Sequence, residues 1–102
     1  MDAAIESRRE EIAGLCRRFG VKRLDLFGSA VSGGFDPRSS DFDFLVDLGE
    51  QSSAAYVEAY FGLQESLEGL LGRPVDLVTD RSLTNPYLRT SILQSRQPVY
   101  PA

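Results

Sequence analysis

The segment SSDFDFLVDL, residues 39–48, constrains the fold most strongly because it alternates apolar and polar side chains as a half-buried strand does. One face would hold Phe42, Phe44, Val46 and Leu48. The other face would begin with Asp41 and Asp43, although strands are depleted in aspartate. Because the run 44–46 is apolar on both faces, the sheet should be covered on both sides at that point. The chain therefore places two like charges together on a strand inside a sheet.

Length and charge limit what such a chain can be. Its 102 residues, 42% of them hydrophobic and 25% charged, predict one globular domain spanning residues 1–102. The net charge of −4 argues against direct nucleic-acid binding through many phosphate contacts. Histidine is absent from the sequence, so any catalysis must depend on carboxylates, hydroxyls or metal ions.

The expected location is the cytoplasm. Cys16 is the single cysteine, which excludes an internal disulfide and suits a reducing compartment. The charged N-terminal sequence is unlike a signal peptide, and no apolar run is long enough to span a membrane. We therefore expect no membrane association.

Periodicity and turn residues predict the other elements, namely helices over 2–19, 52–72 and 85–97 and strands over 21–27, 73–79 and 98–100. Ser29 would cap a short helical turn after the first strand, and a loop would follow over 35–40. Val57 and Phe61 lie off the main helical stripe and are interpreted as an additional core contact, with a partner surface as the alternative. This order predicts an α/β (α+β) single domain, with a small mixed sheet flanked by helices.

The paired carboxylates suggest a metal site. Residues two apart on a strand point the same way and lie roughly 6.6 Å apart. Asp41 and Asp43 would repel each other unless one were protonated or a cation lay between them. Mg²⁺ binds carboxylate oxygens and leaves positions open for water and phosphates. The alternative is that the pair is the hydrated face of an edge strand.

Two further features favour phosphate chemistry. Gly28-Ser29 follows a strand, where a glycine admits phosphate oxygens and a helix N-terminus directs amide groups at an anion. Asp76 interrupts the apolar strand PVDLV and could complete a metal site or accept a proton from an attacking hydroxyl. Taken singly, the first could be an ordinary turn and the second a polar residue near a strand edge. The three features together indicate a phosphoryl-transfer site.

The combination of Gly28-Ser29, the Asp41-Phe42-Asp43 motif and the later Asp76 resembles the polymerase-beta-type nucleotidyltransferases. The segments LFGSAVSGGFDPRSSDFDFLVDL and GRPVDLVT are similar to the minimal nucleotidyltransferases, over nearly the whole chain. The resemblance implies a polymerase-beta-like fold and two Mg²⁺ ions held by Asp41, Asp43 and Asp76. It also implies that Gly28 and Ser29 cradle the β- and γ-phosphates of ATP. This chain has Ala-Val-Ser at 30–32 where many members have an arginine, which predicts weaker phosphate binding or a lower rate.

The resemblance also implies a partner. Minimal nucleotidyltransferases are typically paired with HEPN-domain toxins, so this chain would be an antitoxin that transfers AMP from ATP to a tyrosine of that toxin. One alternative is an antitoxin that neutralises the toxin by docking without catalysis. Another is nucleotidylation of a small molecule such as an aminoglycoside, as in longer relatives. Three intact carboxylates favour an enzyme, and the short length disfavours a small-molecule acceptor.

Overall fold

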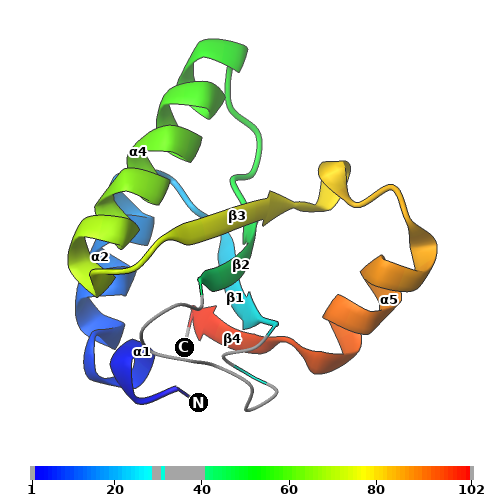
Figure 1. Ribbon diagram of the computed structural model, residues 1–102. Coiled ribbons are helices and arrows are strands. Elements are labelled where there is room, and N and C mark those ends of the chain that lie inside the picture. The colour runs from blue at the N-terminus through cyan, green and yellow to red at the C-terminus, as the bar shows by residue number, and fades with distance from the viewer. Residues whose placement is uncertain (1, 29–30, 32–40, 102) are drawn as a thin grey trace.

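The computed structural model describes residues 2–28, 31 and 41–101, which form a sheet with helices on both sides (Figure 1). The α-helices are α1 (Ala3–Ser7), α2 (Arg9–Arg18), α4 (Ser53–Leu71) and α5 (Pro86–Ser95), and η1 (Asp80–Ser82) is a 3-10 turn. The strands are β1 (Arg23–Phe27), β2 (Phe42–Asp47), β3 (Val75–Thr79) and β4 (Gln97–Tyr100). Among the described residues, no helix is both long enough and apolar enough to cross a membrane.

The sheet is mixed, with the strand order β3-β2-β1-β4. β1 runs antiparallel to both β2 and β4, whereas β2 and β3 are parallel. A parallel pair cannot be joined by a tight turn and needs a long crossover, which α4 supplies between β2 and β3. The predicted fold class, a small mixed sheet flanked by helices, is therefore confirmed.

The core lies between one face of the sheet and helices α1, α2 and α4. The alternation predicted for β2 holds, because Phe42, Phe44 and Val46 face these helices and are almost completely buried. The neighbouring strands and the helices contribute Leu24, Leu26, Val75, Leu77, Ile5, Ile12, Cys16, Leu63 and Leu67. Each large apolar side chain buried in this way stabilises the fold by about 1.5–3 kcal/mol.

The opposite face of the sheet is partly covered by α5, which Figure 1 shows on the other side from α2 and α4. Leu45 points to this second face and is only 6% exposed. The expectation that the sheet is covered on both sides at residues 44–46 is therefore confirmed.

The predicted helix signals act as expected in the two C-terminal α-helices. The Ser52 hydroxyl accepts a hydrogen bond from the amide of Ala55, and Gly72 ends α4 in the left-handed region at φ +68°. The Asn85 side chain caps α5, whose first residue is Pro86.

Two predictions about the helices are wrong. The single helix expected over 2–19 is two helices, because the Arg8 amide bonds to the Ile5 carbonyl three residues back and its backbone leaves helical values at φ −110°, ψ 14°. Val57 and Phe61 are 54% and 59% exposed, so they add no core contact. The predicted short turn after β1 and the loop over 35–40 lie almost wholly outside the described residues.

The thiol of Cys16 should be unreactive in the folded protein. Its side chain is completely buried on α2, and this burial raises the pKa of the thiol to about 12. A thiol-specific reagent at pH 8 should therefore label the native protein far more slowly than the protein in guanidinium, because labelling requires opening of the core. Equal labelling rates in the two states would show that Cys16 is accessible.

Candidate functional site

The two aspartates of the opening segment lie at the start of β2. Asp41 directly precedes the strand and is exposed, whereas Asp43 is its second residue and is half-buried. Their neighbours Phe42 and Phe44 point into the core, so the carboxylates lie on the opposite face of the sheet. The structure thus places the pair as the sequence predicts.

Asp76 joins them through the pairing of β2 with β3. In this parallel pair Asp43 is opposite Asp76, and neighbouring strands lie about 4.8 Å apart. Val75 and Leu77 on either side of Asp76 are buried, so the exposed carboxylate of Asp76 projects from the same face as Asp43. Two carboxylates from adjacent strands and one from the strand entrance therefore share one end of this face.

The electrostatics of Asp43 agree with this placement. The pKa of Asp43 is raised above its ordinary value, first by burial, then by the negative charge of Asp76 and then by that of Asp41. Burial disfavours the ionised form, and each neighbouring carboxylate adds repulsion. A cation at this end of the sheet would relieve that repulsion.

Gly28 lies beside these carboxylates, and two features of its geometry favour glycine at this position. Its φ is +77°, a conformation that residues with a Cβ rarely adopt. A Cβ built at this position would lie 2.4 Å from Oδ2 of Asp43, which is too close for any real contact. The turn after β1 and the Asp43 carboxylate therefore fit together only with glycine at this position. Ser29, the other residue predicted to cradle phosphates, lies outside the described residues.

The donor set fits a hard divalent cation, since Asp41, Asp43 and Asp76 offer carboxylate oxygens of the kind that Mg²⁺ prefers. As they stand, however, no three acidic or cysteine side chains in the described ranges are gathered closely enough to hold a metal ion. The magnesium site therefore stays a prediction, and it requires these side chains to turn toward a shared ion.

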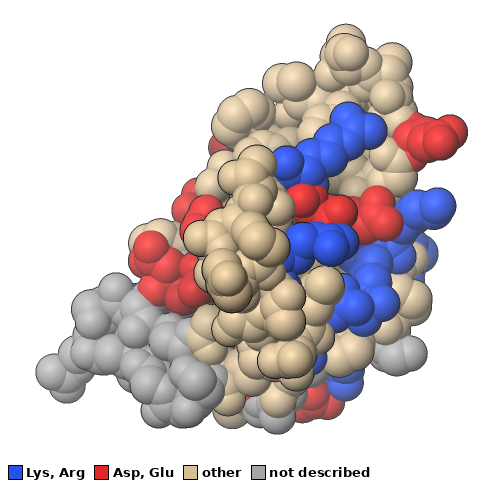
Figure 2. All heavy atoms as spheres, turned by 90° about the vertical axis from the view of Figure 1, so that its right-hand side faces the viewer, with Lys and Arg blue, Asp and Glu red and all other residues tan. Residues whose placement is uncertain are grey.

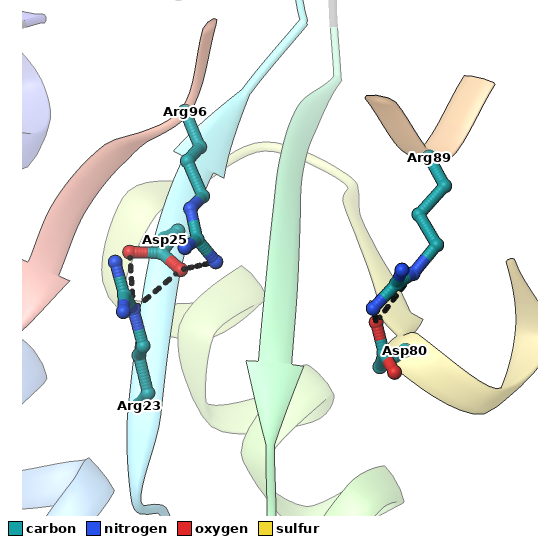
Figure 3. Close-up of polar contacts among 5 residues, drawn as sticks. All are labelled: Arg23, Asp25, Asp80, Arg89 and Arg96. Atoms are coloured by element: carbon teal, nitrogen blue, oxygen red, sulfur yellow. Dashed lines mark hydrogen bonds and ion pairs between the residues drawn. The ribbon is translucent and has the colours of Figure 1, made fainter. Parts of the chain in front are cut away.

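Sequence reasoning missed a buried charge on the same face of the sheet. Asp25 of β1 is only 1% exposed, and it accepts hydrogen bonds from two arginines, as Figure 3 shows. The Nε of Arg23 lies 3.1 and 2.9 Å from its two oxygens, and Nη1 of Arg96 lies 3.2 Å from Oδ2. An aspartate between Leu24 and Leu26, with an arginine two residues earlier on the same face, was an available signal.

The fold and the three carboxylates define a small domain of the nucleotidyltransferase type, and comparison with known proteins agrees. The family described as nucleotidyltransferase domain matches residues 9–99, a stretch that includes Gly28 and all three aspartates. The chain belongs to this family, so the predicted recognition and nucleotidyltransferase class are confirmed.

Two relatives carry more specific names. A protein of Thermococcus cleftensis named protein adenylyltransferase MntA is 41% identical over 86 residues, covering 84% of this chain and 80% of its own length. A protein of Methanocaldococcus jannaschii, provisionally named a protein adenylyltransferase, is 40% identical over 75 residues, which are 74% of this chain and 73% of the relative. Both matches extend over most of each chain.

Solved structures support the same fold. A structure provisionally described as a minimal nucleotidyltransferase has a TM-score of 0.79 and 37% identity, and the match covers 96% of each chain. A crystal structure of a toxin–antitoxin with AMP-PNP has a TM-score of 0.67 and 25% identity, covering 90% of this chain and 72% of that chain.

Substituting Gly28 by alanine should disturb both the turn and Asp43. The left-handed backbone and the 2.4 Å approach to the carboxylate predict a loss of about 1 kcal/mol or more in the free energy of unfolding. Gly69→Ala is the matched control, because a Cβ on this α4 glycine would meet nothing within 4 Å and alanine favours helix. Denaturant titration should rank Gly69→Ala above wild type and Gly28→Ala below it. Equal stability of Gly28→Ala and wild type would contradict the geometry.

Removing the charge of Asp43 should not destabilise the metal-free protein at pH 7. The folded pKa of Asp43 is raised above its ordinary value of 3.8, so ionisation opposes folding above the folded pKa. This penalty fades as pH falls and is absent below the unfolded pKa. Asp43→Asn should therefore equal or exceed wild type in stability at neutral pH, with an advantage that shrinks on acidification.

The control for this experiment is Glu58→Gln, which removes one negative charge from an exposed position on α4. Thermal melts of the three proteins without metal, from pH 7 down to about pH 3, test the expectation. A clear loss of stability in Asp43→Asn relative to Glu58→Gln at pH 7 would show that the carboxylate is a structural hydrogen-bond acceptor.

Proposed function

We propose that this chain is a Mg²⁺-dependent protein adenylyltransferase that transfers AMP from ATP to a tyrosine hydroxyl of a HEPN-domain toxin, and thereby acts as its antitoxin. The observation behind the proposal is the half-buried Asp43, which lies opposite Asp76 and against Gly28. The proposal is supported by relatives named protein adenylyltransferase and by the similar fold of a toxin–antitoxin crystallised with AMP-PNP.

The reaction requires one bond to form and one to break at the α-phosphorus of ATP. The acceptor oxygen bonds to that phosphorus while the bond to the bridging oxygen of the leaving group breaks, which releases pyrophosphate. The hydroxyl proton passes to a carboxylate, and the exposed Asp76 is the candidate acceptor. The turn at Gly28, followed by Ser29, would leave room for the β- and γ-phosphates. Bound Mg²⁺ would supply neutralisation of the phosphate charge.

The remaining parts of the proposal follow from size and charge. Residues 1–102 would form one minimal nucleotidyltransferase domain, and the acceptor would be presented by the partner protein. The acidic balance of −4 disfavours direct binding of nucleic acid. The proposed site of action is the cytoplasm, where ATP and Mg²⁺ are available.

Asp43→Ala should abolish AMP transfer while the protein remains folded. This change removes the carboxylate that lies between the other two, and with it the means of holding charge-neutralising cations. Co-expression with the HEPN-type protein encoded alongside, followed by intact-mass spectrometry, should show a partner heavier by one or more AMP groups with wild type and no gain with Asp43→Ala. Glu58→Gln removes an exposed carboxylate of α4 that is not one of the three aspartates, and it should transfer AMP as wild type does.

Two results would contradict this function. Transfer at the wild-type rate by Asp43→Ala would remove the catalytic assignment. A stable complex without any gain in partner mass, in the presence of ATP and Mg²⁺, would replace the enzyme with a docking antitoxin.

A further inference from the structure

A pocket of about 540 Å³ opens between α5 and the sheet face that bears the carboxylates. Its apolar wall includes Leu45, Tyr56 and Leu93, and the buried cluster of Arg23, Asp25 and Arg96 lies at one side. In Figure 3 this cluster and the Arg89–Asp80 ion pair lie on either side of β2. A volume of this size is typical of a site that encloses a small ligand or a few side chains.

The charge of the pocket differs in sign from that of the protein. Four arginines and three aspartates line it, in a chain whose net charge is −4. Figure 2 shows basic side chains gathered on this side of the molecule with acidic groups between them. The residues that line the pocket therefore carry a net charge of +1.

The excess positive charge can be traced to particular side chains. Arg23 and Arg96 share the single carboxylate of Asp25, and Arg89 is paired with Asp80 at 2.9 Å. Arg81 is exposed and makes no hydrogen bond or ion pair with any residue in the described part of the chain. One further anion at this position would find an unpaired guanidinium group and additional donors on Arg23 and Arg96.

The pocket is also placed to serve the reaction. Leu45 and Asp47 line it, and they lie two and four residues after Asp43 on the same face of β2. At about 3.3 Å per residue, the pocket lies roughly 7–13 Å along the strand from Asp43. A few residues of an extended polypeptide can span this distance.

We infer that this pocket binds an acidic side chain of the polypeptide acceptor and thereby holds the segment whose hydroxyl receives AMP; the inference rests on the proposed function. A single carboxylate matches the excess of one positive charge in the lining. A triphosphate fits less well, because it brings several negative charges toward Asp25, Asp47 and Asp80. The pocket therefore selects the acceptor, and the turn at Gly28 serves the nucleotide.

Arg81→Gln tests the inference because it removes the unpaired charge without breaking an ion pair within the described structure. Calorimetric titration with the HEPN-type partner should show affinity weakened roughly five- to tenfold, with a larger loss for Arg81→Glu and a smaller dependence on salt than wild type. Affinity for ATP with Mg²⁺ should stay unchanged. Arg17→Gln is the matched control, because Arg17 is an exposed arginine of α2 that makes no ion pair with the described residues and lies outside the pocket.

Other outcomes overturn the inference. If Arg81→Gln weakened ATP binding and left partner binding unchanged, this would be a nucleotide pocket. If Arg81→Gln changed neither ATP binding nor partner binding, the charge of the pocket would recognise neither ligand. Failure of the proposed function can be distinguished from failure of this inference. It would appear as binding of the partner by wild type without AMP transfer, and the effect of Arg81→Gln on partner affinity could still be measured.

Discussion

The parallel pairing of β2 with β3 is the constraint on which the site depends, because its register puts Asp43 opposite Asp76. The carboxylates repel each other, so their own interaction cannot hold this register. The packing on the other face holds it, since a slip by one residue would turn buried side chains such as Phe44 and Leu77 out of the core. Burial of those side chains therefore outweighs the repulsion, and the fold keeps a group of charges that the site requires.

Two aspartates on the same face of the sheet differ in how their charge is compensated. Asp25 is almost fully buried, and two guanidinium groups of the chain itself satisfy its carboxylate. Because Arg23 is on β1 and Arg96 directly follows the last residue of α5, this cluster ties β1 to the end of α5. Asp43 is half-buried among like charges, and burial first and then the charges of Asp76 and Asp41 raise the pKa of its carboxyl. The first arrangement is complete within the chain, whereas the second favours an external cation.

The sequence predicted the features that depend on local signals. The alternation around Asp43, the Ser52 and Asn85 caps and the glycine at the end of α4 all use residues within a few positions of one another. The Asp25–Arg96 contact joins residues 71 positions apart, so no local pattern could reveal it. The exposure of Phe61 was missed because helical spacing alone does not say how wide a stripe its neighbours cover. The predictions for Ser29 and the metal ions stay predictions.

A single strand connects the two parts of the polar face. Asp43 lies near the start of β2, and Leu45 and Asp47 of the arginine-lined pocket lie farther along the same strand, so their separation is set by rigid backbone. An acceptor segment bound in the pocket would therefore reach Asp43 without a large rearrangement of this chain. Under the proposed function, specificity would come from the pocket and chemistry from the carboxylates, and changes in one could leave the other intact.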